Sequence, residues 1–303
     1  MDLAIPDPYG LTASDSLSIA SLRELWPASM GAREIQETLP AAIRDRAVFS
    51  ARTTNARYLQ AVKDRVERYL AGGYKGDKAT LRVELKAELA RLGYSPERGF
   101  PGDEALGIPP AEPGSLRDLG SSQRINLILD TQLRLMTGRA QRAAGLDPLA
   151  LERYPAWELI RTEDRVKKRQ WLRRWVEAGG QLYGANKDRM IALKQAEVWD
   201  ILGDPTFFHD ALGVDHPPFA YNSGMGWRQI DEEECLELGV LEAPLPIPAQ
   251  PPTTALDLLP DAVASTDGLD DGILKKLKDS LGGLLTAAGK TWRWIFNRGN
   301  SGS

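Results

Sequence analysis

The sequence is poor in the residues that build disulfides and metal sites. Among 303 residues there are one cysteine, Cys235, and two histidines, His209 and His216. A single cysteine excludes an intrachain disulfide and is typical of a reducing compartment. The two histidines lie seven residues apart, and no HExxH or CxxC spacing accompanies them. We therefore expect no metal site and no cofactor.

Long hydrophobic runs are also missing. No stretch reaches the roughly 18 consecutive apolar residues that a transmembrane helix needs. The first ten residues, MDLAIPDPYG, hold two acids and two prolines where a signal peptide would have a basic start and an apolar run. We expect the chain to be made and used in a cytoplasm.

The common catalytic motifs are absent. There is no Walker loop and no GxGxxG, and Ser223 is not in a GxSxG elbow. The net charge of −4 argues against a general nucleic-acid binder. We expect no enzyme and name no catalytic residue. Because a Ser–His–Asp group is assembled in space rather than in sequence, an unrecognised hydrolase remains an alternative.

What is present predicts an α+β fold that is predominantly helical. Helical periodicity runs through residues 32–39, 40–70, 80–92 and 116–144. The expected parts are an N-terminal helical region (1–94), a Pro/Gly-rich connection (95–114), a small mixed domain (115–240), an acidic Pro-rich tether (241–271) and a C-terminal segment (272–303).

The mixed domain alternates short elements. We expect a strand at 157–162, helices at 170–178, 197–202 and 231–238, a hairpin at 182–193, and an irregular region at 205–226. Asp231 is placed to cap the start of the last helix, and Glu234 occupies the reciprocal position of a capping box. Gly239 follows the end of this helix.

A basic and aromatic segment, residues 161–175, has a net charge of +5. Its bases are Arg161, Arg165, Lys167, Lys168, Arg169, Arg173 and Arg174. Together with Trp171 they are candidates for contact with nucleic acid or an acidic protein surface. The competing interpretation is a solvated helix face with its tryptophans in the core. The spacing of four between Trp171 and Trp175 favours this second interpretation, because it places both on one face.

Residues 272–297 have the pattern of an amphipathic helix. Its apolar face is expected to dock through Leu277, Leu281, Leu284, Leu285, Trp292, Ile295 and Phe296. Such a helix suits a groove on a partner protein or a membrane surface, and it could also pack on its own domain. The tether of residues 241–271 would set how far this helix can reach from the mixed domain.

Several segments resemble the head morphogenesis proteins of the Mu F-like phage family. They are LPAAIRDRAVFSARTTNARYLQAV, SSQRINLILDTQLRLMTGRAQRA, PAWELIRTEDRVKKRQWLRRWVEAGG, RMIALK and PPFAYNSGM, which span approximately residues 40–240. Many members carry a histidine after the D-x-R element and a cysteine-flanked arginine after the double proline. Here Trp171 and Ser223-Gly224-Met225 occupy those regions. No metal or disulfide role of those family residues is therefore implied.

The resemblance implies a structural minor head protein of a phage or prophage, present in a few copies per particle. It implies contact with the portal protein and with capsid or scaffold proteins during procapsid assembly. The chain would then occupy the bacterial cytoplasm during assembly and afterwards the virion head. The alternative from the residues themselves is a nucleic-acid-associated factor acting through residues 161–175.

Overall fold

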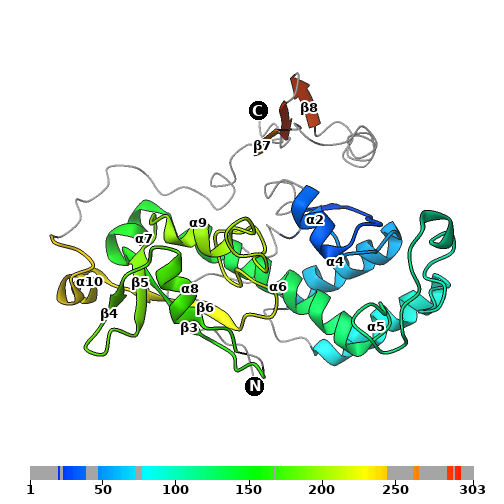
Figure 1. Ribbon diagram of the computed structural model, residues 1–303, viewed down its shortest axis with the longest axis horizontal. Coiled ribbons are helices and arrows are strands. Elements are labelled where there is room, and N and C mark those ends of the chain that lie inside the picture. Colours follow the sequence, from blue (N-terminus) through cyan, green and yellow to red (C-terminus); the bar gives the residue numbers. More distant parts are fainter. Residues whose placement is uncertain are drawn as a thin grey trace. The chain divides into compact units, whose positions relative to one another are not determined.

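The computed structural model describes residues 20, 23–38, 47–72, 77–166 and 168–243, and the backbone of strands within 262–294. The fold is mixed α+β with more helix than strand, as expected (Figure 1). The chain divides into two compact units. The described parts of the first unit are 23–38, 47–63, 82–124 and the strands within 262–294. Those of the second unit are 20, 64–72, 77–81, 125–166 and 168–243.

Helices make up most of the first half of the described chain. They are α2 (Ala32–Thr38), α4 (Ala56–Ala71), α5 (Lys78–Arg91), the 3-10 turn η1 (Glu104–Leu106), α6 (Ser122–Gly145) and α7 (Pro148–Arg153). None of the helices among the described residues combines the length and the apolar character needed to cross a bilayer.

The predicted helix over residues 40–70 is wrong for residues 47–55, and residues 40–46 lie outside the described residues. Strand β2 (Ala47–Val48) pairs in parallel with β1 (Glu24–Leu25), and α4 begins only at Ala56. The Asn55 side chain accepts a hydrogen bond from the Tyr58 amide at 3.2 Å, so it caps the first turn. This local cap, and the β-branched residues before it, outweigh the helical pattern upstream.

Gly138 lies inside α6, where glycine is normally unfavourable. A Cβ atom at this position would lie 2.0 Å from the Pro217 carbonyl oxygen and 2.6 Å from Nδ1 of His216. The glycine is therefore required because the 215–218 loop crosses the helix in contact with its backbone.

We predict that Gly138→Ala destabilises the protein by about 1–3 kcal/mol, although alanine is the better helix former. Urea unfolding of the variant measures this cost. Gly72→Ala is the matched control, since its nearest contacts are ordinary ones at 3.5 Å or more. A Gly138→Ala variant as stable as the parent protein would contradict the close crossing.

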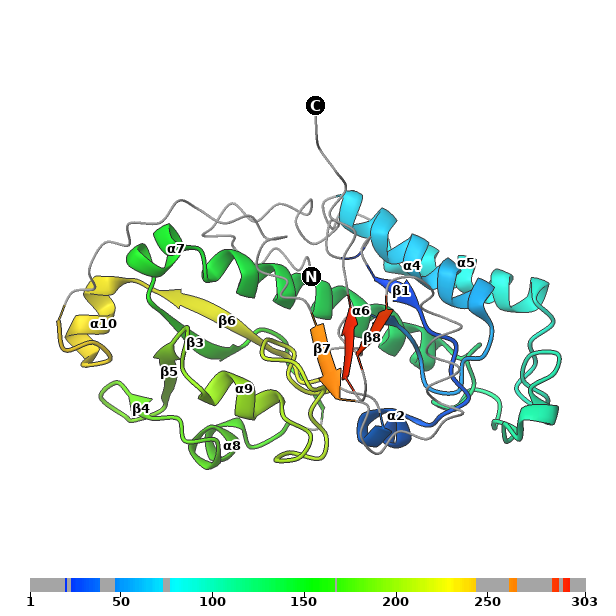
Figure 2. The same cartoon turned by 90° about the horizontal axis from the view of Figure 1, so that it is seen from above.

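A four-stranded antiparallel sheet is the centre of the second unit (Figure 2). Its order is β4-β5-β3-β6, with bounds Leu182–Tyr183, Arg189–Leu193, Ala156–Arg161 and Met225–Ile230. The predicted strand and hairpin are confirmed. Strand β6 was not predicted, because the Ser223-Gly224 turn and Gly226 interrupt the apolar pattern.

The two faces of the sheet are covered by different helices. On one face Trp157, Leu159 and Trp227 pack with α8 (Trp171–Glu177) and α9 (Val198–Gly203). The Trp157 and Trp227 rings stack at 3.8 Å across the β3–β6 pair. Because side chains alternate along a strand, the neighbouring residues Ala156 and Glu158 lie on the other face, which packs with α10 (Glu232–Leu238).

Helix α10 is capped as predicted at both ends. The Asp231 carboxylate accepts from the Glu234 amide at 2.8 Å, and Gly239 adopts φ 70° after the last turn. The reciprocal half of the capping box is replaced. The Glu234 carboxylate instead accepts from Arg189 and Arg228, because two guanidinium groups are stronger partners than one backbone amide.

The predicted C-terminal helix is wrong where the structure describes that segment. Strands β8 (Leu285–Ala288) and β9 (Thr291–Trp294) pair with each other, and β9 also pairs with β7 (Ala262–Ser265). Thr291 and the two tryptophans of β9 favour extended backbone. Leu285 and Trp292 thus belong to strands, and β7 lies within the predicted tether. The other docking residues, Leu277, Leu281, Leu284, Ile295 and Phe296, lie outside the described residues.

Candidate functional site

The tryptophans of the basic and aromatic segment are core residues. Trp171 is 3% exposed and Trp175 is fully buried. The indole N–H of Trp175 donates to the Gln181 carbonyl at 2.7 Å, and that of Trp199 donates to the Leu193 carbonyl at 2.8 Å. These rings are therefore occupied by internal packing, and Trp171 has no face open for stacking on a nucleobase.

Arg174, predicted as a binding residue, is buried and holds two elements together. Its guanidinium lies 4.1 Å from the Phe208 ring centroid and 4.9 Å from that of Trp171. It donates to Asp210 at 2.7 Å and to the Leu202 carbonyl at 3.1 Å. Burial lowers the pKa of Arg174, while Asp210 opposes this shift. The residue fastens α8 to the segment after α9.

Arg169 shares this carboxylate. Its Nε donates to Asp210 at 2.5 Å, and its Nη2 donates to the Tyr221 carbonyl at 2.9 Å. Burial alone would raise the pKa of Asp210, but hydrogen bonds from Arg169 and Arg174 lower it. Asp210, Arg169 and Arg174, which we call the Asp210 group, connect the start of α8 with the loop before β6.

The remaining bases of residues 161–175 lie nearer the surface. Glu163 pairs with Arg165 from its own loop and with Arg134 from α6. Lys168 pairs with Asp164 at 2.8 Å, and Arg173 pairs with Glu177 at 2.7 Å.

Two bases of the segment remain the best placed to meet a partner. Lys168 and Arg173 are the more exposed, with 57% and 79% of their side chains accessible. Arg161 ends β3, and Lys167 lies outside the described residues. Much of the segment's positive charge is therefore matched by carboxylates of the same unit.

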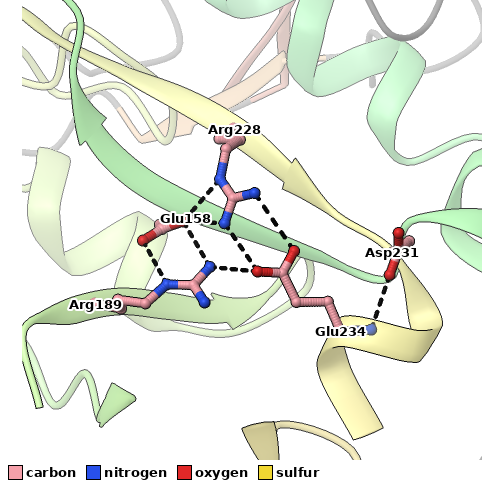
Figure 3. A network of polar contacts seen from close by, with 5 residues as sticks. All are labelled: Glu158, Arg189, Arg228, Asp231 and Glu234. Carbon is pink, nitrogen blue, oxygen red and sulfur yellow. Dashed lines mark hydrogen bonds and ion pairs between the residues drawn. The ribbon is translucent and has the colours of Figure 1, made fainter. Parts of the chain in front are cut away.

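The most extensive charged group is a network that the sequence did not reveal (Figure 3). We call it the Glu158 network: Glu158 on β3, Arg189 on β5, Arg228 on β6 and Glu234 on α10. Glu158 stands directly opposite Arg228 in the β3–β6 register. The charges alternate, and the two arginines each contact both glutamates.

Each arginine of the network donates two hydrogen bonds to Glu158. Arg189 donates through Nε and Nη2 to the two oxygens of Glu158, at 3.0 and 2.9 Å. Arg228 donates to Glu158 Oε2 at 2.9 and 2.6 Å. Nη2 of Arg189 and of Arg228 then reach Oε1 of Glu234, at 2.6 and 3.0 Å. Three strands and α10 are joined by this one group of side chains.

Electrostatics keep both glutamates ionised. Burial alone would raise the pKa of Glu158, but hydrogen bonds from Arg189 and Arg228 outweigh it and lower the pKa. The pKa of Glu234 is lowered for the same reasons. A carboxylate with a lowered pKa and occupied oxygens is a poor proton acceptor at neutral pH. The arrangement suits holding the sheet and helix together.

We predict unequal costs for neutralising the two glutamates. Glu158→Gln leaves two arginines against a nearly buried amide and should cost roughly 2–4 kcal/mol, a buried-pair penalty reduced because Arg228 is partly exposed. Glu234→Gln, on the better solvated side, should cost about 1 kcal/mol or less.

Urea unfolding at neutral pH measures both values. Since both folded-state pKa values are lowered, the stabilisation is present above the unfolded pKa of about 4.5 and is lost as pH falls through the folded values. Equal costs, or a Glu158→Gln cost that is unchanged in acid, would contradict the assignment.

His216 belongs to a further internal group, which we call the Asp215 group. It is fully buried, and its Nδ1 donates to the Pro217 carbonyl at 2.8 Å. The adjacent Asp215 pairs with Arg142 and lies 3.6 Å from Arg139, both on α6. Burial would raise the pKa of Asp215, but His216 and the two arginines lower it. The group fixes the 215–218 loop against α6. His209 is exposed.

Lys194 is another residue whose role could not be predicted from the sequence. It follows β5, is fully buried, and places its ammonium 5.3 Å from the Trp157 ring centroid. It donates to the Ala150 carbonyl at 3.2 Å. Burial lowers its pKa to about 7, against a smaller opposing effect of Cys235. Burial also raises the pKa of the Cys235 thiol to about 12, which keeps that group protonated and unreactive.

The lowered pKa of Lys194 predicts a pH-dependent stability. Between about pH 7 and 10.5 the unfolded lysine binds more protons than the folded one, so folding becomes more favourable as pH rises. Lys194→Met should remove this dependence. The stability difference between variant and parent should therefore change by about 1.4 kcal/mol per pH unit in that window.

Urea unfolding of both proteins across this pH range tests the prediction. Lys168→Met is the matched control, because that side chain is exposed and its stability difference should stay nearly constant. A pH-independent difference for Lys194→Met would show that the buried ammonium remains charged.

The comparisons with known proteins give no relative: no family model, curated protein or solved structure matches the chain. Within the described residues there is also no group of three or more His, Cys, Asp or Glu side chains placed to hold a metal ion.

Proposed function

We propose that the chain is a structural minor head protein of a phage or prophage, acting in procapsid assembly through contact with the portal protein. The observation that carries the proposal is the placement of the segments that resemble the Mu F-like family. PAWELIR forms β3, RMIALK forms β5 with Lys194, and PPFAYNSGM leads into β6.

The resembling segments supply the core of one unit. Trp157, Trp171 and Trp175 of the segment 155–180, Met190 of RMIALK and Phe219 of PPFAYNSGM lie in one hydrophobic cluster. The segments that resemble the family are thus far apart in the sequence but pack together in one core. This supports a shared fold better than scattered similarity in surface loops would, since core packing constrains several segments at once.

The charged groups of this unit also support a structural role. The Glu158 network, the Asp210 group and the Asp215 group each join different elements of the unit. Such groups make a rigid body that keeps its shape while it binds another protein. An assembly component needs that property, because a preorganised surface loses less entropy on binding.

The nucleic-acid alternative is less well supported. Burial of Trp171 removes a base-stacking contact, and many of the bases already pair with carboxylates. The exposed bases Lys168 and Arg173 could still contact phosphates, and this is the remaining support for the nucleic-acid alternative.

The proposal is tested by co-expression of this chain with the portal and major capsid proteins that are encoded by neighbouring genes. We expect the chain to be found in purified procapsids in a few copies. Particles made without it should show altered yield, shape or DNA retention. Normal particles in its absence, together with no incorporation when it is present, would overturn the proposal.

A charge-reversal variant separates the two functions. Lys168→Glu with Arg173→Glu changes two exposed side chains whose surface ion pairs contribute about 0–1 kcal/mol each, so the fold should be kept. Incorporation that survives both this variant and nuclease treatment indicates protein contact. Incorporation lost in both cases, with unchanged unfolding, would favour the nucleic-acid function.

A further inference from the structure

The loop between α5 and α6 is fixed by two buried carboxylates. Asp103, 2% exposed, accepts from the Phe100 amide at 2.8 Å and from the Thr54 hydroxyl. Asp118, 6% exposed, accepts from the Gly114 and Gly120 amides at 2.8 Å. Such bonds hold a loop in one conformation, at the cost of burying two charged groups. A simple connection between two helices does not need them.

The middle of this loop, residues 108–113, reads IPPAEP. Proline fixes φ near −65°, and a residue before proline is restricted to extended backbone. Ile108, Pro109 and Glu112 each precede a proline. Residues 108–112 lie outside any helix, strand or turn, and a turn follows at Pro113, where the Ser115 amide donates to the Glu112 carbonyl at 3.1 Å. These constraints predict the polyproline II conformation, which has three residues per turn.

Burial along the segment follows that period of three. Ile108 and Ala111 are half-buried, and their amides donate inward to the Asp103 carbonyl at 3.1 Å and the Pro96 carbonyl at 2.7 Å. The residues on the other two edges are exposed: Pro109, Pro110, Glu112 and Pro113. One edge is therefore anchored to the scaffold, and the other two face outward with the spacing Pro110-x-x-Pro113.

We propose that residues 108–113 form a docking segment for a partner protein that reads polyproline II ligands through a groove lined with aromatic side chains. This recognition mode uses the outward edges of a proline-rich ligand that is already ordered. Leu106 and Leu116, 58% and 52% exposed, flank the segment and extend its apolar surface. The inference stands independently of the proposed role in phage heads.

A second copy of the chain is a poor reader of this segment. A polyproline groove needs several exposed aromatic rings side by side. Among the described side chains that are large, hydrophobic and exposed, Phe207 is the one aromatic residue, and the tryptophans whose side chains the structure describes are buried. We therefore take the partner to be a different protein.

The test uses the full chain and three purified polyproline-reading domains as probes: an SH3, a WW and an EVH1 domain. We expect at least one to bind saturably, with NMR shift changes centred on residues 106–116. Pro110→Ala with Pro113→Ala should weaken that binding at least about ten-fold. Both side chains are exposed, so the fold should survive. Pro101→Ala, an exposed proline of the same loop outside the segment, should bind like the parent.

Preorganisation gives a further readout. Asp118→Asn should weaken binding several-fold without touching the exposed prolines, because loosening the loop adds an entropy cost to binding. No binding to any probe, shifts outside residues 106–116, or full binding by the double proline variant would each overturn the proposal. Self-association that is lost in the double variant would assign the segment to a second copy and would also overturn it.

Discussion

The pairing of β3 with β6 is the interaction on which the second unit depends. It joins residues about 70 positions apart and sets a single register for six residue pairs. That register stacks Trp157 against Trp227 on one face and places Glu158 opposite Arg228 on the other. A shift by one residue would exchange the faces and bury an ion pair among tryptophans. The hydrophobic and the charged side chains therefore specify the same arrangement.

Charge in this unit acts mainly as internal fastening. The arginines join strands, helices and loops through shared carboxylates, and several also donate to backbone carbonyls. A buried ion pair adds less stability than apolar packing of the same volume, but it penalises wrong pairings strongly. We infer that these groups contribute specificity of the fold. This explains how a segment with a net charge of +5 can be largely a structural element.

Much of this architecture could be predicted, because its signals are local. The spacing of Trp171 and Trp175 placed α8 and its buried face, and Asp231 and Gly239 marked both ends of α10. The Glu158 network could not be predicted, since it depends on pairing between residues far apart in the sequence. The burial of Lys194 likewise depends on α7 and Trp157. In the C-terminal segment, Trp292 fits the apolar face of a helix together with Ile295 and Phe296, whereas Trp292 and Trp294, two residues apart, fit one face of a strand, and the strand is what forms.

We propose that an internally charge-paired domain serves as a structural component beside the portal. Cryo-electron microscopy of procapsids assembled from the portal, the major capsid protein and this chain tests this role. We expect density at the portal vertex into which the four-stranded sheet with α8, α9 and α10 fits as one body. Particles that contain the chain but show this density elsewhere in the shell, or not at all at the portal vertex, would contradict it.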